Sequence, residues 1–297
     1  MPSPLLRTRL APTPSGLLHP GNGLSFIMAW AIARAYGGQI LLRIDDLDKA
    51  RTRPAYVEDI FRTLEWLGLD YDEGPQTVEG FFRHWSQHTR LGLYESRLQQ
   101  LREEERLFAC TCSRRQIRQV SEDGAYPGTC LHKHRDFEAP NTAWRVEAPA
   151  EGAAVAFWQW RAGRQKVSLA GIDAFVVRQK NGYPAYQLAS LVDDTHFGVN
   201  FVVRGADLWA STLAQHYLAQ LLGLEAFQQT TFWHHGLIAG KDGEKLSKSK
   251  GAGSLKAWRE DGRSPYPLIQ MAGKQLKLEA PVSTLDALLA GLQARVS

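Results

Sequence analysis

Residues 243–251 read GEKLSKSKG and concentrate positive charge in a short segment. Lys245, Lys248 and Lys250 fall within six residues, separated by serines and flanked by glycines. Lysine ammonium groups are compact charges that bind phosphate. Glycines allow a loop to close over a ligand. The pattern predicts a phosphate-binding loop, although an ordinary basic surface loop can have the same composition.

A second segment, residues 9–23, reads RLAPTPSGLLHPGNG and joins two apolar stretches. One stretch ends at Leu10, and the other covers residues 24–36 before the glycine pair at 37–38. Residues 39–44 then have the composition of a buried strand, so the order predicts strand, loop, helix, strand, which is a βαβ unit. His19 and Asn22 fall at the start of the helix. Backbone N–H groups and the helix dipole favour an anionic phosphate there.

Together the two segments resemble the signatures of class I aminoacyl-tRNA synthetases. HPGN at 19–22 is similar to their HIGH sequence, and KLSKS at 245–249 is similar to KMSKS. Three further segments are similar to glutamyl-tRNA synthetases in particular: RLAPTPSG at 9–16, RIDDLD at 43–48 and VRGADL at 203–208. The resemblance covers residues 7 to about 255.

The resemblance implies an α/β fold: a class I synthetase Rossmann-type parallel sheet with a zinc-bearing insertion and a short helical C-terminal extension. We expect the first half of the Rossmann nucleotide-binding domain at 1–105, the insertion at 106–170, the second half with the KLSKS loop at 171–255, and the extension at 256–297. Leu285, Leu288, Leu289 and Leu292 have helical spacing, which predicts a final helix that packs back on the body.

Composition agrees with a globular protein. The chain has 297 residues, of which 44% are hydrophobic and 22% charged. Its N-terminus lacks the pattern of a secretory signal, and its longest apolar stretch is interrupted by Arg34. We therefore expect a cytoplasmic monomer with no membrane partner. The net charge of +4 permits RNA binding without requiring it.

The chain has a short C-terminal region, with 48 residues after Ser249. Glutamyl-tRNA synthetases carry a large helical anticodon-binding region at that point. The short form resembles the glutamyl-queuosine tRNA(Asp) synthetase family, whose members glutamylate a modified base. The resemblance implies L-glutamate, ATP with Mg²⁺, and tRNA(Asp) bearing queuosine as partners.

Three cysteines, Cys110, Cys112 and Cys130, suggest a metal site. Their odd count and the one-residue spacing of the first two disfavour a disulfide framework. Clustered thiolates suit tetrahedral Zn²⁺, which needs a fourth ligand. Imidazole is the usual choice on chemical grounds, from His132 or His134. The resemblance implies Tyr126 instead, because YPGTC at 126–130 matches the Tyr-x3-Cys pattern of short family members, with His132 as the alternative. Three unconnected buried thiols are the remaining interpretation.

Side chains for L-glutamate are predicted from carboxylate chemistry and from the resemblance. Planar guanidinium groups bind carboxylates at two points, which suits Arg9 and Arg204. The resemblance assigns Tyr186 a substrate contact, and Thr13 lies in the first loop. Asp45 stands where many relatives have Glu to bind the substrate ammonium, and Asp is one methylene shorter.

Other polar residues have less specific predictions. We expect Asp207 to orient a loop or contact the ATP ribose, and Asp193 and Asp194 are nearby acidic candidates. We interpret His196 as structural. RNA contacts are predicted for a set of aromatic and basic residues, with ordinary surface and core as the alternative: Phe81, Phe82, Arg83, Trp85, Arg114, Arg115 and Arg118.

The predicted chemistry is attack of the glutamate carboxylate on the α-phosphorus of ATP. His19, Asn22, Lys245 and Lys248 would stabilise charge on the phosphates, with no protein nucleophile. His19, Asn22, Asp207 and Lys248 would contact ATP. Three alternatives remain: a truncated glutamyl-tRNA synthetase that charges a tRNA 3′ end, a ligase that glutamylates a small molecule, and a non-catalytic tRNA-binding or regulatory module.

Overall fold

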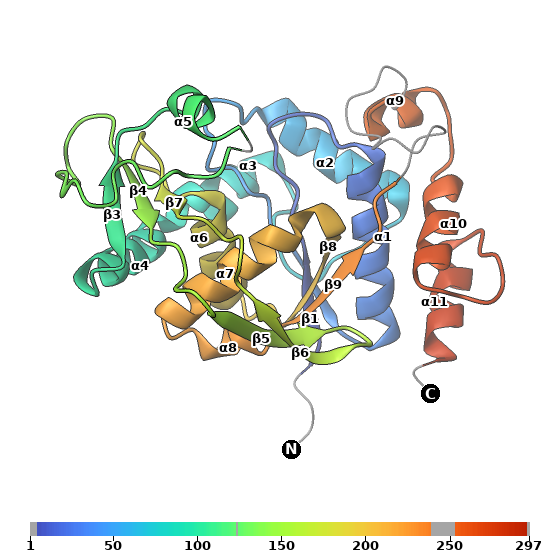
Figure 1. Cartoon of the computed structure of the whole chain (residues 1–297). Helices are drawn as coiled ribbons and strands as arrows, with labels where there is room; N and C mark the ends of the chain where they lie inside the picture. Colours follow the sequence, from blue (N-terminus) through green and yellow to red (C-terminus); the bar gives the residue numbers. More distant parts are fainter. Residues whose placement is uncertain (1–4, 123, 239–252, 296–297) are drawn as a thin grey trace. The chain divides into compact units, whose positions relative to one another are not determined.

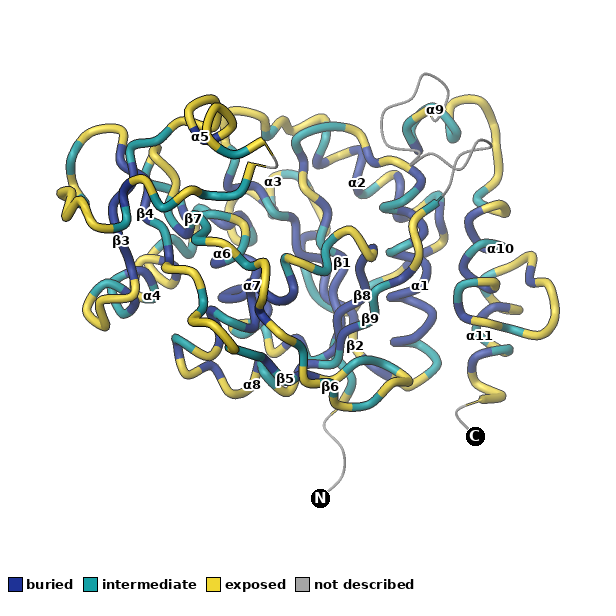
Figure 2. Tube along the Cα trace, viewed as in Figure 1, coloured by how far each residue is buried: buried dark blue, intermediate teal, exposed yellow. Residues whose placement is uncertain are grey.

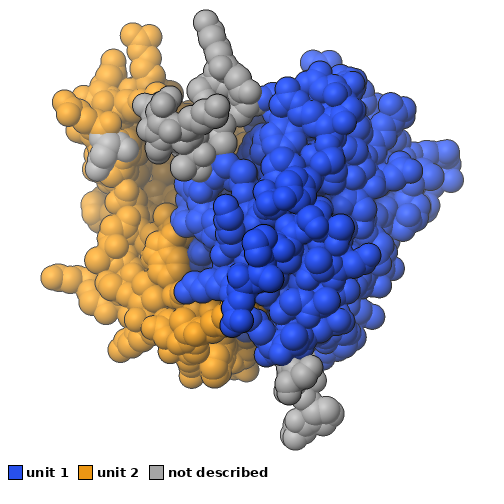
Figure 3. All heavy atoms as spheres, turned by 90° about the vertical axis from the view of Figure 1, so that its right-hand side faces the viewer, with its two compact units in different colours: residues 1–89, 199–208, 231–297 blue, residues 90–198, 209–230 orange. Residues whose placement is uncertain are grey.

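A computed structural model describes residues 5–122, 124–238 and 253–295 (Figure 1). The chain forms two compact units: unit 1 comprises residues 1–89, 199–208 and 231–297, and unit 2 comprises residues 90–198 and 209–230 (Figure 3). The strands are β1 (Arg7–Leu10), β2 (Gln39–Leu42), β3 (Leu107–Cys110), β4 (Ala143–Val146), β5 (Ala154–Gln159), β6 (Gly163–Ser168), β7 (Phe175–Arg178), β8 (Phe201–Gly205) and β9 (Thr231–His235). The longer helices are α1 (Pro20–Ala35), α2 (Pro54–Leu67), α4 (Leu91–Glu103), α5 (Arg114–Val120), α6 (Tyr186–His196), α7 (Trp209–Leu221), α9 (Leu255–Glu260), α10 (Tyr266–Gln275) and α11 (Leu285–Gln293). Short helical segments are α3 (Val78–Gly80), η1 (Phe81–Trp85), η2 (Gln87–Arg90), η3 (Ala206–Leu208) and α8 (Glu225–Gln228).

Unit 1 is built on parallel strands. β1 pairs in parallel with β2, and β8 pairs in parallel with β9. β1 also lies beside β8, because the Asn200 backbone N–H donates to the Arg7 carbonyl at 3.0 Å. The predicted βαβ unit is confirmed as β1, α1 and β2. The helix begins at Pro20, earlier than the apolar stretch, because proline fits the first helical position without losing a hydrogen bond.

Helix α1 forms the centre of unit 1. Most of its residues are buried, including Ile27, Met28 and Ile32, which are fully buried (Figure 2). A helix that is apolar around its circumference must be covered on several sides. β1 and β8 pack against α1, and so do α10 and α11. Within the described residues, no helix is both long and apolar enough to cross a membrane.

The C-terminal helices cover α1 through close contacts. A Cβ atom at Gly23 would lie 3.0 Å from side chains of both Leu255 and Leu268, so this glycine permits the close approach. Leu288 and Leu292 of α11 are buried, whereas Leu285 and Leu289 are partly exposed. The predicted terminal helix that packs back on the body is confirmed.

Unit 2 contains antiparallel sheet and helices. β4 pairs with β3 and β7, and β5 pairs with β6 as a hairpin. A buried polar network joins α4 to α6: Arg90 binds both carboxylate oxygens of Asp193 at 2.7 and 3.0 Å, and the Tyr94 hydroxyl donates to the same carboxylate at 2.7 Å. Removing one partner of such a buried pair typically costs about 3–5 kcal/mol.

Candidate active site

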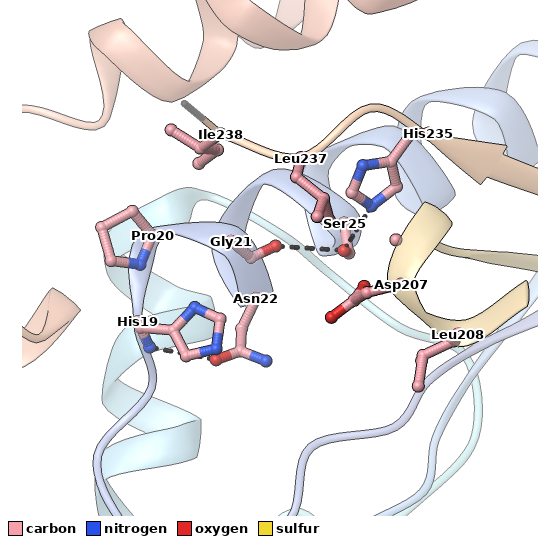
Figure 4. A pocket seen from close by; sticks show the side chains of 11 residues that line it. His19, Pro20, Gly21, Asn22, Ser25, Asp207, Leu208, His235, Leu237 and Ile238 are labelled. Carbon is pink, nitrogen blue, oxygen red and sulfur yellow. Dashed lines mark hydrogen bonds between the residues drawn. The ribbon is translucent and has the colours of Figure 1, made fainter. Parts of the chain in front are cut away.

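A pocket of about 280 Å³ opens at the N-terminus of α1 in unit 1 (Figure 4). Its lining comes from three places that are distant in sequence: the start of α1, the end of β8 with η3, and the end of β9. The lining residues are His19, Pro20, Gly21, Asn22, Ser25, Gly205, Asp207, Leu208, His235, Leu237 and Ile238. The carboxyl ends of parallel strands and a helix N-terminus meet at this pocket, an arrangement that favours phosphate-bearing ligands.

Asn22 and His19 are held in a defined arrangement at the start of α1. The His19 backbone N–H donates to Asn22 Oδ1 at 3.0 Å. Because the amide oxygen accepts this bond, the Asn22 NH₂ group remains as a donor, and Figure 4 shows it turned away from the His19 backbone. A Cβ atom at Gly21 would lie 2.9 Å from His19 Cε1, so glycine leaves room for the imidazole ring. The local sequence therefore presents an imidazole and an amide at the helix N-terminus.

Asp207 lines the same pocket from η3. A Cβ atom at Gly205 would lie 2.5 Å from Asp207 Oδ1, so glycine at 205 is needed for the carboxylate to take this position. Asp207 is exposed and lines the pocket. The structure thus brings Asp207 to the pocket of His19 and Asn22.

His235 and Ser25 are pocket residues that the sequence analysis missed. Ser25 Oγ lies 2.6 Å from His235 Nε2, and His235 Nδ1 lies 2.9 Å from the Gly236 carbonyl oxygen. Burial lowers the pKa of His235, although the Gly236 carbonyl and Asp207 act in the opposite direction. Because a carbonyl oxygen can only accept, Nδ1 carries a proton toward Gly236, while the Ser25 hydroxyl also donates to the Gly21 carbonyl at 3.0 Å. The available signal was the position of His235 at the end of a strand ahead of the lysine-rich segment.

Lys245 and Lys248 lie outside the described residues, in the gap from 239 to 252. Their neighbours Leu237 and Ile238 line the pocket. Their predicted phosphate contacts stay predictions.

Arg9 and Arg204 both lie in unit 1, and both are buried. Arg9 Nη1 donates to the Val203 carbonyl at 3.5 Å, which brings the two arginines to neighbouring positions of β1 and β8. Arg204 stands inside β8 rather than at its junction with the following loop, and its guanidinium lies 4.9 Å from the Phe232 ring centroid. Two buried cations in one region favour the binding of an anion.

The other residues predicted to contact glutamate, Asp45, Thr13 and Tyr186, differ in exposure and in their side-chain partners. Asp45 forms a two-point ion pair with Arg43, with nitrogen–oxygen distances of 2.7 and 3.0 Å. This ion pair occupies both carboxylate oxygens. Thr13 is exposed in the first loop of unit 1. Tyr186 begins α6 in unit 2, and its side chain is 44% exposed.

Several other predictions concern polar and aromatic surface. Asp193 is committed to the buried network of Arg90, and Asp194 is also buried. His196 is exposed and packs edge-on against Phe197. The prediction of Phe81 as an exposed RNA contact is wrong, because its ring is fully buried in the core of unit 1.

The three cysteines gather in unit 2, with their sulfur atoms all within 4.8 Å of one another. Cys112 and Cys130 Sγ lie 3.6 Å apart. Zn–S bonds of about 2.3 Å at tetrahedral angles require sulfurs about 3.8 Å apart, so this spacing fits zinc. The interpretation as three unconnected thiols is wrong, because the chain brings all of them together.

The pKa values of Cys112 and Cys130 are shifted in opposite directions. Burial, together with the neighbouring thiols, raises the pKa of Cys112 to about 11. Burial opposes ionisation of Cys130 as well, but hydrogen bonds from the Thr111 backbone and from nearby side chains outweigh it and lower its pKa to about 6. A cation that binds all three sulfurs would therefore release protons.

The candidates for the fourth ligand, Tyr126, His132 and His134, differ in placement. Tyr126 Oη lies 3.4 Å from Cys110 Sγ and accepts from the Cys130 backbone N–H at 2.9 Å. His132 and His134 are exposed. The hydroxyl of Tyr126 thus stands beside the sulfurs, which makes it a suitable fourth donor.

The chain matches known proteins over most of its length. Residues 5–276 match the family described as tRNA synthetases class I (E and Q), catalytic domain. A glutamyl-Q tRNA(Asp) synthetase of Symbiobacterium thermophilum is 39% identical over 279 residues, which cover 89% of this chain and 84% of that protein. Glutamate--tRNA ligase 2 of Syntrophus aciditrophicus is 34% identical and covers 89% of this chain, but this chain spans 56% of its length.

The fold is shared with a solved enzyme. The crystal structure of the glutamate-tRNA synthetase from Elizabethkingia anophelis superposes with a TM-score of 0.76 and 21% identity, over 96% of this chain and 65% of that one. This similarity, the family match and the parallel strands of unit 1 give this chain the class I synthetase catalytic fold. Together with the family match, these similarities show that this chain belongs to the class I tRNA synthetases for E and Q, within the glutamyl-Q tRNA(Asp) synthetase family.

Proposed function

We propose that this protein activates L-glutamate with ATP and transfers the glutamyl group to queuosine in the anticodon loop of tRNA(Asp). The observation that carries the activation step is the pocket at α1, where His19, Asn22 and Asp207 meet at a helix N-terminus. The name of the related glutamyl-Q tRNA(Asp) synthetases, at 36–39% identity over most of this chain, supports the acceptor.

In the activation step, the glutamate α-carboxylate attacks the α-phosphorus of ATP, and pyrophosphate leaves as glutamyl-adenylate forms. His19 and the Asn22 NH₂ group donate to phosphate oxygens, and the dipole of α1 adds positive potential there. The positive charges of Lys245 and Lys248 stabilise the negative charge of the leaving pyrophosphate. Asp207 accepts from the ribose. Mg²⁺ bound to ATP neutralises phosphate charge.

Glutamate recognition relies on charge. Arg9 and Arg204 bind carboxylate groups of the substrate, since both guanidinium groups are buried on adjacent strands. Thr13 and Tyr186 add hydroxyl contacts. Because Asp45 is engaged by Arg43, we expect it to reach the substrate ammonium through that fixed pair or through water.

The cysteine cluster is a structural zinc site held by Cys110, Cys112, Cys130 and Tyr126. The spacing of the sulfurs and the nearby hydroxyl support this ligand set. Zinc would brace the segment from β3 to β4 and take no part in the chemistry at the pocket.

The acceptor distinguishes this proposal from the alternatives. The protein is incubated with labelled glutamate, ATP and purified tRNAs with or without queuosine, and the label is located by nuclease digestion. We expect label on the anticodon nucleoside of queuosine-containing tRNA(Asp), released by mild alkali as an ester should be. Label on the terminal adenosine of tRNA(Glu), or label on a small molecule without RNA, would refute the acceptor.

A further inference from the structure

A basic depression of about 690 Å³ lies beside α5 in unit 2. Its lining comes from α5, from the segment after it and from β4: Arg114, Ile117, Arg118, Glu122, Gly124 and Arg145. None of these residues belongs to the pocket at α1. The lining holds three arginines and one acidic residue, so a bound anion would be favoured.

The two lining arginines of α5, Arg114 and Arg118, receive little electrostatic stabilisation from their own helix. Arg114 and Arg118 stand four residues apart on one face, where like charges repel. Across residues 5–122, 124–238 and 253–295, neither forms an ion pair. α5 has only seven residues and depends on the Ser113–Gln116 capping box and on buried Ile117. An anion between the two guanidinium groups would offset their repulsion.

Arg145 contributes an independent observation. Its guanidinium lies 4.0 Å from the centroid of the Tyr126 ring, and its Nη1 donates to the Ala174 carbonyl at 2.8 Å. These two contacts fix the orientation of the group. Its Nε is buried and has no acceptor among the described residues. The residue as a whole is partly exposed and lines the depression, so the guanidinium held by these contacts can meet an oxyanion there.

Phosphate of an RNA backbone fits this depression better than a small molecule does. Ile117 is the apolar side chain of the lining, whereas small-molecule pockets are predominantly apolar. Arginines on an open, polar surface are typical of sequence-independent backbone contacts. We propose that Arg114, Arg118 and Arg145 bind a backbone phosphate of the tRNA partner, an inference that rests on the proposed function.

Tyr126 connects this depression to the cysteine cluster. Its hydroxyl lies beside Cys110 Sγ, and its ring carries the Arg145 guanidinium. Metal binding that immobilises Tyr126 would therefore also hold Arg145 in place. The cluster would then support RNA binding without contacting RNA.

The test is fluorescence anisotropy with labelled, unmodified tRNA(Asp) transcript over a range of KCl concentrations. Arg114→Ala and Arg118→Ala should each weaken binding about 3- to 10-fold and reduce the slope of log K against log salt by about 0.7–0.9, as expected for one lost phosphate contact. Arg115→Ala is the matched control, because Arg115 is on the same helix but does not line the depression. If Arg115→Ala weakens binding as much as Arg118→Ala, or if Arg118→Ala has no effect, the inference is overturned.

Arg145→Lys separates positioning from charge. Lysine keeps the charge but loses the planar contact with Tyr126 and two-point binding. We expect weaker RNA binding with unchanged zinc content and melting temperature, and unchanged RNA binding would contradict the role of Arg145. Glutamate-dependent ATP–pyrophosphate exchange without RNA should equal wild type in all these variants. Absence of exchange in the wild type would instead refute the proposed function. The anisotropy result would still decide whether the depression binds RNA.

Discussion

Gly21 is predicted to be required for activity but not for stability. A Cβ atom at this position would lie 2.9 Å from His19 Cε1 and 3.0 Å from Nδ1, whereas ordinary contacts begin near 3.4 Å. In Gly21→Ala the imidazole ring must therefore shift by about 0.5 Å. His19 is exposed, so its ring can move without disturbing the core. The substitution should displace a phosphate-binding group and leave the fold intact.

Gly21→Ala should have opposite effects on stability and on activity. Alanine is favoured over glycine in a helix by about 0.5–1 kcal/mol, so Gly21→Ala should keep or slightly raise the free energy of unfolding. A misplacement of about 1 Å in a reacting group can cost about 100-fold in rate. A shift of half that size predicts about a tenfold loss, or about 1.4 kcal/mol of transition-state stabilisation.

The assay is ATP–pyrophosphate exchange with glutamate, combined with thermal unfolding. Gly92→Ala is the matched control, because Gly92 is also the second residue of a helix, α4, and a Cβ atom there meets nothing within 4 Å. We expect the control to gain stability and keep full exchange activity. If Gly21→Ala also keeps full activity while His19→Ala loses it, the orientation of the ring is not what Gly21 provides.

Three further predictions concern separate features. Asn22→Asp should retain the cap at the start of α1 and the stability of the fold, but lower the exchange rate at least about 100-fold, because it replaces an NH₂ donor with a negative charge; a rate within about twofold of wild type would contradict this. Burial, Arg204 and His235 lower the pKa of His234 to about 3. Between pH 6.5 and about 3 this histidine is therefore protonated in the unfolded state but neutral in the folded state, so the free energy of unfolding should fall as the pH drops through that range. Urea titrations should show a weaker pH dependence in His234→Gln. Zinc should copurify at about one equivalent, and Cys110→Ser should lose it and lower the melting temperature; elemental analysis should show a larger loss for Tyr126→Phe than for His132→Ala, and the reverse order would move the fourth ligand to His132.

Features encoded by nearby residues were predictable from the sequence. The βαβ unit follows from the order of apolar stretches and glycines, although α1 begins at Pro20, before the apolar stretch that predicted it. His19, Gly21 and Asn22 are within one helical turn, so their mutual arrangement is local. Cys110 and Cys112 are separated by one residue, and Tyr126 is four residues from Cys130, so proximity within each pair needs little more than a turn, whereas the two pairs meet through the fold of the unit.

Contacts between distant segments were decided by the tertiary structure. Ser25 and His235 are 210 residues apart, and their 2.6 Å contact exists because α1 and β9 meet at the same pocket. Sequence periodicity marks which residues are buried but not which strand lies beside which. For that reason His235 was missed, and the sequence left Phe81 between an RNA contact and the core, where its side chain is fully buried.

The sequence by itself determined the family and the residues at the start of α1 for which phosphate contacts are proposed, because both depend on residue types at short spacing. Only the tertiary structure decided that Arg9 lies beside Val203 and Arg204, that Asp45 pairs with Arg43, and that Tyr126 carries Arg145 on its ring. The physical reason is that side-chain partners are selected by strand order and packing, which bring together groups that no local pattern connects.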